Sequence, residues 1–434
     1  MRGFLSESIW RRQREPLQLV PQCGKCGLDK TCQSPKMPVS GEGRRKILIV
    51  AEAPGENEDR RGIQLVGDAG NICATILHKV GINMRKDCWI TNAIICRSWE
   101  KNENGATVNR TPTDDEIDWC RPNLSNTIQR LKPDIIIPMG ERAVRSIMPL
   151  LWKEGEVDSI GTWVGWQIPS VKINAWVCPT YHPSAVSYDR TPLTELLMTK
   201  HLRAVDKLQG KPYPDGPPDY RKMVHCIYDA EEAATAIDQM MTDAVAFDET
   251  GNDALQPIAF DYETTMLKPE GAKARILCCS LSNGHQTIAY PMIGRAVEMT
   301  KQFLKSDIPK IAANLQFEDR WSRKILKVIV RNWLWDTLLG AHWLDCRRGI
   351  VSVKFQSFVL LGADDYSYII DPDKGSRGST KENRMDKVEI SDLLTYCGLD
   401  SLFEYLIAQK QMSHLPKEKP ECPILPLTPT PSWL

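Results

Sequence analysis

The chain has 434 residues, and its 55 Lys and Arg residues balance 55 Asp and Glu residues, so its formal net charge is zero. Such neutrality argues against a protein that coats nucleic acid by bulk electrostatics, but it does not exclude local basic grooves. The composition, 42% hydrophobic and 25% charged, is that of a globular protein of two or three domains and excludes disordered and collagenous classes.

Targeting signals are not evident in the sequence. No window contains the ~18 uninterrupted apolar residues of a membrane span, so no membrane partner is expected. The N-terminal segment MRGFLSESIWRRQREPLQLV lacks the apolar core of a signal peptide, which predicts a cytoplasmic protein. In that compartment the 14 cysteines are not expected to form a structural disulfide set.

A proline- and glycine-rich segment divides the chain. Residues 209–222, QGKPYPDGPPDYRK, contain four prolines and two glycines, which forbid a continuous helix and predict an extended linker. The last residues, 413–434, are also rich in proline and are expected to form a tail. We therefore expect one domain at 1–208 and another at 223–412.

Before the linker, short apolar runs alternate with amphipathic segments. The expected strands are residues 45–55, 88–95, 133–140 and the start of 176–184, and the expected helices are 70–82, 115–132 and 141–152. This alternation predicts a mostly parallel sheet with helices on both faces. Ligands of such α/β folds bind beyond the carboxyl ends of the strands.

After the linker, a second α/β pattern follows. Residues 223–229, 258–265 and 276–284 are strand-like, and residues 230–244 form an amphipathic helix. Three further segments are expected to be helices or strand-to-helix units: residues 310–329, 336–345 and 390–411. The fold class is therefore α/β in both domains.

Four cysteines have a spacing that suggests a shared site. Cys23-Gly-Lys-Cys26 is a CxxC turn that can direct two thiolates at one metal or cluster, and Cys96 and Cys120 can complete a set of four. The CxxC turn by itself fits zinc, a redox pair or an iron–sulfur cluster. Cys96 and Cys120, taken separately, also fit ordinary buried core positions.

Six motifs occur around these cysteines in one order. They are CGKCGLDKTC, ILIVAEAPGENEDRRGIQLVGDAGNI, WITNAIICR, NRTPTDDEIDWCRPNL, MGERAV and PTYHPSAV. Their order resembles that of the family 4 uracil-DNA glycosylases, which carry an iron–sulfur cluster, over about residues 20–205. The resemblance implies a uracil-DNA-glycosylase-like α/β/α sandwich, in which Cys23, Cys26, Cys96 and Cys120 ligate a [4Fe-4S] cluster.

The same resemblance implies a base pocket. Cleavage of an N-glycosidic bond requires an extruded base, a pocket that reads its polar edge and stabilisation of the departing anion. Glu52 would orient or activate water, Asn92 would pair with the uracil O4 and N3–H, and His182 would donate to O2. A strand-end Glu or a His before Pro also fits a purely structural position.

Other positions of the pocket follow from the motifs. The resemblance implies that Glu58 helps to exclude the thymine methyl group, that Gly55 shapes the turn, and that Ser184 belongs to the HPS motif beside the base. Two residues depart from the family pattern. Ala51 replaces the usual Gly, and Leu65 replaces a Phe that stacks on the flipped base, a contact worth ~1–3 kcal/mol.

An acidic pair lies in the second half of the chain. Asp261 and Glu263 are two residues apart on a predicted strand, so their side chains point to one face. Two carboxylates on one face of a buried strand repel each other unless a cation lies between them. By itself the DxE pair also fits two solvated acids.

Two further motifs follow the acidic pair. Asn314-Leu-Gln-Phe-Glu318-Asp319 and Tyr396-Cys-Gly-Leu-Asp400 come later in the chain, with DTLL at 336–339 between them. This order resembles the 3′–5′ proofreading exonuclease domain of family A DNA polymerases over about residues 223–412. The resemblance implies a ribonuclease H-like (DnaQ-like) fold.

The chemistry implied is two-metal hydrolysis at single-stranded 3′ ends, with two Mg²⁺ or Mn²⁺ ions about 4 Å apart. Asp261, Glu263 and Asp400 would bind the ions, and Tyr396 would orient the attacking water. Asn314 would contact the substrate. The fourth metal ligand is Glu318 by alignment, although the neighbouring Asp319 would replace it if the turn shifts.

Together the two resemblances point to the N-terminal part of certain phage-type DNA polymerases, and thus to a bacterial or phage-infected cytoplasm. We expect a DNA-processing enzyme of replication or repair that recognises and excises uracil and hydrolyses DNA from its 3′ end. The polymerase domain of such proteins would follow residue 412, so we expect either a natural split or truncated product, or a separate polymerase subunit as partner. In the alternative interpretation, the first domain only reads uracil or docks a polymerase. A further alternative is zinc in place of the cluster.

Overall fold

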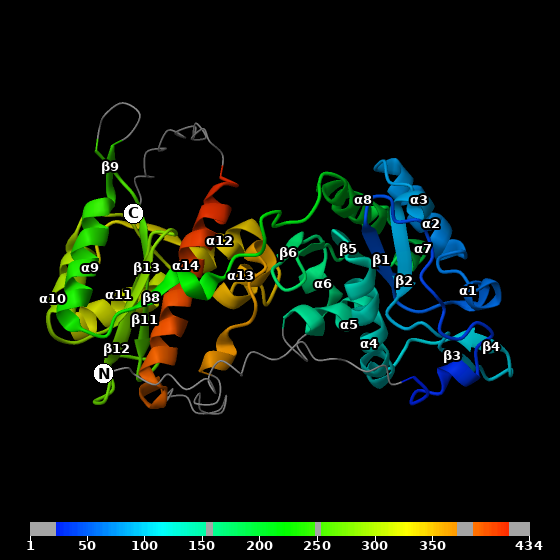
Figure 1. Cartoon of the computed structure of the whole chain (residues 1–434), viewed down its shortest axis with the longest axis horizontal. Coiled ribbons are helices and arrows are strands. Elements are labelled where there is room, and N and C mark those ends of the chain that lie inside the picture. The colour runs from blue at the N-terminus through cyan, green and yellow to red at the C-terminus, as the bar shows by residue number, and fades with distance from the viewer. Residues whose placement is uncertain (1–22, 153–158, 248–252, 371–384, 416–434) are drawn as a thin grey trace, which may run out of the picture.

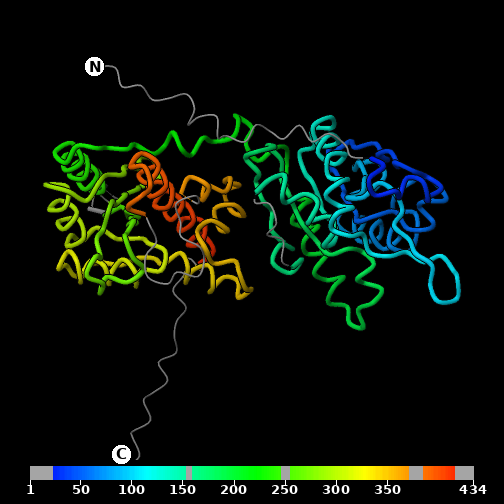
Figure 2. The backbone as a smooth tube through the Cα atoms, turned by 90° about the horizontal axis from the view of Figure 1, so that it is seen from below, coloured from blue at the N-terminus to red at the C-terminus, as the bar shows by residue number. Residues whose placement is uncertain are grey.

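The structure, a computed structural model, describes residues 23–152, 159–247, 253–370 and 385–415. Most of the expected tail lies outside these residues. The described chain forms two units side by side, each built around one sheet, and both views show them next to each other (Figure 1, Figure 2). The expected α/β fold class is confirmed for both units.

The first sheet has five strands in the order β2-β1-β5-β7-β6. Its strands are β1 (Ile47–Ala51), β2 (Cys88–Asn92), β5 (Ile135–Pro138), β6 (Ile168–Ser170) and β7 (Ala175–Val177). All neighbouring pairs are parallel except β6 with β7. The carboxyl ends of β1, β2, β5 and β7 therefore meet at one edge, where the sequence places its polar motifs.

Alternate residues of β1 face opposite sides of this sheet. Ile47 and Ile49 pack against α2 (Asp68–Lys79) and α8 (Leu193–Asp206). Leu48 and Val50 pack against α4 (Asp114–Leu131) and α5 (Glu141–Leu151). This alternation is the strand period of two, and it produces the predicted helix–sheet–helix sandwich.

The helix α4 begins at a capping box. The Thr113 hydroxyl accepts from the Glu116 N–H, and the Glu116 carboxylate accepts from the Thr113 N–H. The other elements of this unit are short. They are a 3-10 turn (Leu28–Lys30), α1 (Glu56–Arg61), α3 (Met84–Asp87), β3 (Trp99–Lys101), β4 (Thr107–Asn109), α6 (Ile160–Trp163) and α7 (Ser184–Tyr188).

The second sheet has six strands in the order β15-β14-β11-β12-β13-β8. They are β8 (Val224–Cys226), β11 (Ile258–Thr264), β12 (Ile276–Ser282), β13 (Thr287–Pro291), β14 (Lys310–Ala312) and β15 (Trp333–Asp336). The consecutive strands β11, β12 and β13 are antiparallel, whereas β14 is parallel to β11 and β15 to β14. This order and these directions are those of the ribonuclease H-like fold.

Helices cover both faces of the second sheet. The helices α9 (Ala230–Asp243) and α10 (Gly294–Lys305) pack on one face together with Trp321 of α11 (Leu315–Trp321), and α14 (Ile390–Met412) packs on the other. The other elements are β9 (Val245–Phe247), β10 (Asp253–Leu255), a π-helical turn (Ser322–Leu326), α12 (Thr337–Leu344), α13 (Val353–Leu361) and 3-10 turns at Tyr220–Met223, Ser367–Ile369 and Met385–Lys387.

The segment between the two sheets is not a free linker. The Tyr213 backbone N–H donates to the Asn174 side chain over 3.2 Å, and the Tyr213 and Tyr220 hydroxyls donate to the Leu361 carbonyl. Among the described residues, no helix combines the length and apolar character that crossing a membrane requires.

Candidate active sites

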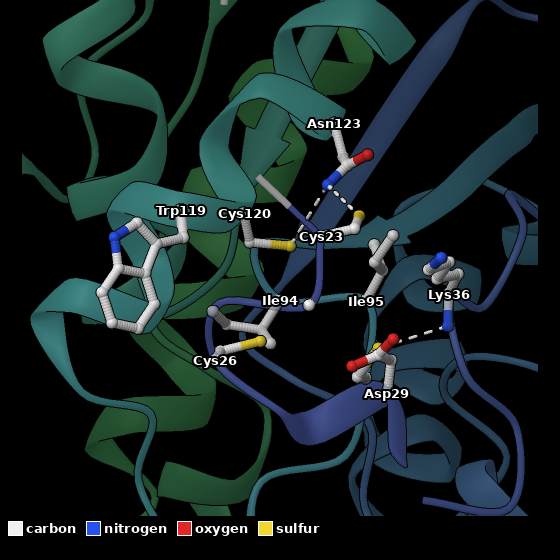
Figure 3. A pocket seen from close by; sticks show the side chains of 11 residues that line it. Cys23, Cys26, Asp29, Lys36, Ile94, Ile95, Trp119, Cys120 and Asn123 are labelled. Atoms are coloured by element: carbon white, nitrogen blue, oxygen red, sulfur yellow. Dashed lines mark hydrogen bonds between the residues drawn. The ribbon is translucent and has the colours of Figure 1, made fainter. Parts of the chain in front are cut away.

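A cysteine-lined pocket lies in the first unit, beyond the carboxyl ends of β1 and β2. Cys23, Cys26, Cys96 and Cys120 all line it, as the sequence predicted for a shared site. Figure 3 shows the Asn123 side chain beside the sulfurs of Cys23 and Cys120, and its amide nitrogen lies 3.8 and 3.7 Å from them. Three distant parts of the chain, the CxxC turn, the segment after β2 and α4, therefore meet at one point.

Three of the four thiols have apolar neighbours. Leu28, Ile94 and Ile117 form a small core with Cys26, Cys96 and Cys120, whereas Cys23 is exposed. Burial raises the pKa of Cys96 to about 12 and that of Cys120 to about 11, so the protein alone favours the neutral thiols. The Lys36 backbone N–H donates to the Cys96 sulfur over 3.2 Å, which is a contact that stabilises a thiolate. A positively charged group in the pocket would favour the thiolate forms of Cys96 and Cys120.

The spacing of the thiols bears on what they can hold. Among the described residues, the one set of three or more His, Cys, Asp or Glu ligand atoms within 4.8 Å of one another consists of carboxylates of the second unit. No three of the four cysteine sulfurs therefore all lie within 4.8 Å of one another, whereas the ligands of a tetrahedral zinc lie about 3.8 Å apart for Zn–S bonds of about 2.3 Å.

A second group of polar residues lies at the carboxyl ends of the strands. Glu52 follows β1 and accepts from the Arg142 backbone N–H over 3.1 Å at the start of α5. Gly140 separates it from His182: a Cβ atom at Gly140 would lie 2.4 Å from a Glu52 oxygen and 2.9 Å from the His182 Cβ. Gly140 also has a φ of 92°. The structure thus brings Glu52 and His182 together, and only glycine leaves room between them.

His182 is held in one orientation. Its Nδ1 lies 2.7 Å from the Ser184 hydroxyl, and the Ser184 backbone N–H also points at it. Burial lowers the pKa of His182, and the nearby Glu52 and Glu58 carboxylates oppose this shift only in part. The ring is therefore neutral at pH 7, with Nε2 left to act on a ligand.

Asn92 ends β2 opposite Ala51 of β1. It is 3% exposed, and its Nδ2 donor has no partner among the described residues. An unpaired buried donor costs about 1–3 kcal/mol, so its presence at a strand end indicates a site that a ligand completes.

The Glu58 carboxylate lies beside the loop that follows α1. Its Oε1 accepts from the backbone N–H groups of Val66 and Gly67, over 2.9 and 2.8 Å, and so holds the loop that carries Leu65. A Cβ at Gly55 would lie 2.8 Å from the other Glu58 oxygen. Leu65 is 6% exposed and packs in the core, with a φ of 50°. The Glu58 carboxylate and the loop that carries Leu65 are thus held together by these hydrogen bonds.

A cluster of carboxylates lies in the second unit, on β11 and α14. Asp261, Glu263 and Asp400 offer oxygens that all lie within 4.8 Å of one another. Burial raises the pKa of Asp261, and the carboxylates of Glu404, Asp400, Glu263 and Glu318 raise it further. Bound divalent cations would relieve such repulsion, and carboxylate oxygens are ligands that suit Mg²⁺ and Mn²⁺.

The side chains of Glu318 and Asp319 have different surroundings. Glu318 is 2% exposed, burial raises its pKa, and its Oε2 has no partner among the described residues. Asp319 forms an ion pair with Arg323, with an Oδ2–Nε distance of 2.6 Å. Neither residue belongs to the trio of Asp261, Glu263 and Asp400. The Glu318 carboxylate is nevertheless close enough to raise the pKa of Asp261.

Tyr396 and Asp400 are one helical turn apart on α14, as expected. The Tyr396 hydroxyl accepts from the Lys354 ammonium, whose Nζ lies 3.5 Å from an Asp400 oxygen. The Tyr366 hydroxyl donates to the same Asp400 oxygen. Asn314 is exposed at the start of α11, with a φ of 60°, and its backbone N–H donates to Asp336.

Several residues of this cluster were not foreseen. Glu404 is 2% exposed, has an unpaired Oε2, and contributes the largest charge effect on Asp261. Glu404 lies four residues after Asp400, so the two share one face of the helix, and this spacing could have identified Glu404 from the sequence. Asp336 was included only as part of the DTLL segment. Lys354 and Tyr366 come from a segment with no recognisable motif.

Comparisons with known proteins agree with the two units. The family model for the uracil DNA glycosylase superfamily matches residues 38–205. A type-4 uracil-DNA glycosylase of Saccharolobus solfataricus is 33% identical over 197 residues, which cover 44% of this chain and 85% of that protein. A DNA polymerase of Bacillus phage SP01 is 25% identical over 350 residues, which cover 71% of this chain and 34% of the polymerase.

Among solved structures, ribonuclease D of Escherichia coli, an exoribonuclease, is similar with a TM-score of 0.29 and 12% identity, covering 44% of each chain. The glycosylase relative, by contrast, matches most of its own length with a third of its residues identical, and the matched region contains the strand-end residues described above. By its N-terminal region, the chain belongs to the uracil-DNA glycosylase superfamily.

Proposed function

We propose that the chain is a DNA-processing enzyme with two hydrolytic sites. The first unit, about residues 1–208, is a family 4 type domain that excises uracil from DNA. The second, about residues 223–412, removes nucleotides from 3′ ends with the help of divalent cations. The proposal rests on two groups of residues that come from distant parts of the chain: Glu52, Asn92 and His182 at one sheet edge, and the acidic trio at the other.

In the first site the chain's own groups match the polar edge of uracil. The free Asn92 donor and its carbonyl suit O4 and N3–H, and neutral His182 can donate from Nε2 to O2 as charge develops there. Glu52, held by the Arg142 N–H, is placed to orient water towards the sugar carbon. The assignment to family 4 rests on the type-4 relative and on the four thiols of the cysteine-lined pocket.

The four thiols would ligate a [4Fe-4S] cluster. The type-4 relative and the convergence of the four cysteines on one pocket support this proposal. In this domain the cluster would join the CxxC turn, the segment after β2 and α4, and would thereby stabilise the edge that carries the base pocket.

In the second site Asp261, Glu263, Asp400 and Glu318 would hold two Mg²⁺ or Mn²⁺ ions. When bound, these ions supply Lewis-acid stabilisation of the attacking and leaving oxygens. Tyr396 lies beside the trio and is placed to orient water, and Lys354 holds its hydroxyl. DNA rather than RNA is proposed as substrate because the glycosylase relative and the phage polymerase relative both act in DNA metabolism.

The nuclease proposal is tested with Mg²⁺ and end-labelled single-stranded DNA. We expect a ladder of products shortened from the 3′ end, and none with Asp261→Ala. If no ladder forms, or if Asp261→Ala behaves like the parent, this part of the proposal is wrong.

The glycosylase proposal is tested with a uracil-containing oligonucleotide, scored as abasic sites. We expect abasic sites that depend on both Glu52 and His182. Tight binding of uracil-containing DNA without abasic sites would instead support a first domain that only recognises uracil. Leu65, which stands where the family has a Phe, favours this alternative.

A further inference from the structure

The helix α13 belongs to the second half of the chain but packs into the first unit. Its residues Phe355, Phe358 and Val359 are part of the core that also contains Leu48 and Val50 of β1. The Phe358 ring stacks on Trp152, with ring centroids 5.1 Å apart and an interplanar angle of 9°. The helix also contacts α14 of the second unit, so it lies between the two (Figure 1).

The backbone at the end of α13 contacts the first sheet directly. The Gly362 carbonyl accepts from the Val171 N–H over 3.2 Å. A Cβ atom at Gly362 would lie 1.6 Å from the Pro169 carbonyl oxygen, so any side chain there would displace α13 from β6. Gly362 also ends α13 in the left-handed region, with a φ of 63°.

Polar contacts close the interface on its other sides. The Arg347 Nη1 donates to the carbonyls of Gly161 and Val164, over 2.9 Å each, and its guanidinium lies 5.1 Å from the centre of the Trp166 ring. The Tyr213 hydroxyl donates to the Leu361 carbonyl over 2.6 Å. Apolar, backbone and side-chain contacts therefore all hold α13 against the first unit.

The first turn of the same helix enters the carboxylate cluster. Lys354 donates to Tyr396, lies 3.5 Å from Asp400, and sits 4.5 and 4.8 Å from the ring centres of Tyr396 and Tyr366. Tyr366, five residues after the helix, donates to Asp400. Residues 354–366 thus contact Asp400 at both ends. Between them, Phe355, Phe358 and Val359 are buried in the core of the first unit, whereas Leu361 and Ala363 belong to the core around α14.

We propose that the first domain acts as the support of the nuclease site, holding Lys354 against Tyr396 and Asp400 through α13. Lys354 is then a positioning residue, and nuclease activity depends on the contact between the two units. This inference rests on the proposed nuclease function. It assigns the glycosylase-like domain a second role that is independent of whether uracil is excised.

The physical reason is the geometry that hydrolysis demands. A displacement of about 1 Å in a positioning group can reduce the rate about 10²-fold. Lysine is a flexible side chain, and its ammonium stays beside two tyrosine rings and a carboxylate only while the helix backbone is held in place. Because α13 is buried partly against each unit, movement of one unit relative to the other would move Lys354 relative to Asp400.

The test compares two glycine substitutions. Gly362→Ala adds a methyl group against Pro169, whereas Gly349→Ala meets nothing within 4 Å, and both glycines have a positive φ. The two variants therefore share the backbone strain but differ in the contact with the first unit. For Gly362→Ala we expect kcat for DNA hydrolysis to fall on the order of 10- to 100-fold with little change in KM, and for Gly349→Ala a change of less than about twofold.

A double-substitution cycle identifies Lys354 as the group that is displaced. Lys354→Met should lower kcat, Lys354→Arg should retain most of it because the cation stays, and Gly362→Ala should add no further loss in the Lys354→Met background. Independent, multiplying losses, or a Gly362→Ala variant with parental kcat, would overturn the inference.

Calorimetry on the same full-length variants provides a readout without activity. The parent and Gly349→Ala should unfold in one cooperative transition, and Gly362→Ala should show two, which also shows that both units remain folded. Two independent transitions in the parent would refute the coupling. A parent that is inactive but unfolds cooperatively would refute the nuclease proposal and leave the coupling of the domains standing.

Discussion

The two candidate sites differ in how the protein satisfies their polar groups. In the first, Glu52, Glu58 and His182 each have a hydrogen-bond partner from the protein, and the Asn92 Nδ2 donor has none among the residues that the structure describes. In the second, the acids crowd one another. Glu318 and Glu404 are buried, each with one oxygen that has no partner in the described part of the chain, and burial raises the pKa of both.

This difference indicates two kinds of chemistry. Groups that the protein already holds are organised for a neutral ligand with a polar edge, such as a base, and need little rearrangement when it binds. Buried carboxylates that repel one another are organised for cations, because only positive charge makes the ionised cluster stable. The first arrangement therefore suits a neutral polar ligand, and the second suits cations.

The largest expected effect distinguishes the two neighbouring acids of α11. Glu318→Gln keeps the shape but removes the charge next to the cluster, and we expect nuclease activity to fall about 10³-fold because metal-ion catalysis contributes several kcal/mol. Asp319→Asn breaks only the ion pair with Arg323 and should change the rate by less than about threefold. Steady-state rates with Mg²⁺ measure both. Equal losses would show that the turn shifts and that Asp319 is also a ligand.

The next effect concerns the first site, whose groups are held by the protein. His182→Ala should lower uracil excision about 10²- to 10³-fold, the usual cost of removing a donor to a developing anion. Ser184→Ala removes only the hydroxyl at Nδ1 and should cost less. Single-turnover assays with uracil-containing DNA measure the chemical step. An unchanged rate in His182→Ala would exclude this residue as the donor.

The pH dependence of the same site follows from the lowered pKa of His182. Because burial favours the neutral ring, excision that needs this form should persist below the ordinary His value of 6.5 and fall only at lower pH. The unfolded chain takes up this proton first, so the stability of the fold should decrease as the pH drops below 6.5. A rate that rises on acidification through this range would contradict a neutral donor.

Substitutions in the cysteine-lined pocket should change the absorption spectrum of the protein. Cys96→Ser should abolish a broad absorption near ~400 nm and lower the stability of the first domain, whereas Cys88→Ser, a buried cysteine of β2 outside the pocket, should keep the absorption. Iron and zinc analysis of the parent completes the test. A colourless parent with one zinc per chain would refute the cluster.

The smallest effect is expected at Leu65. Leu65→Phe restores an aromatic surface worth ~1–3 kcal/mol to a flipped base. However, Leu65 is buried in the core, where a larger ring costs about 1–3 kcal/mol of folding free energy. We expect less than a tenfold increase in excision, together with a lower melting temperature. A larger gain without loss of stability would show that the pocket has space for the ring.

Much of the architecture could be predicted from local patterns. The alternation along Ile47–Ala51 predicts a strand buried on both faces, and the Thr113 to Glu116 spacing suits a capping box at the start of α4. The Asp261–Glu263 pair and the Tyr396–Asp400 pair each share a face of one element. Local period and spacing are enough for these inferences, because neighbouring residues in one element have fixed relative directions.

The sequence alone therefore predicted the two α/β units, many of their helices and strands, and the residue types of both sites. It predicted no element at 193–206, 287–291, 294–305 or 353–361. The tertiary structure decided which groups meet. It directs Glu318 rather than Asp319 towards Asp261, adds Glu404 to the cluster, and brings Lys354 within 3.5 Å of Asp400, 46 residues away. It also places α13 in the core of the first unit. Such contacts depend on how whole helices pack, and no local periodicity encodes the partner against which a helix is buried.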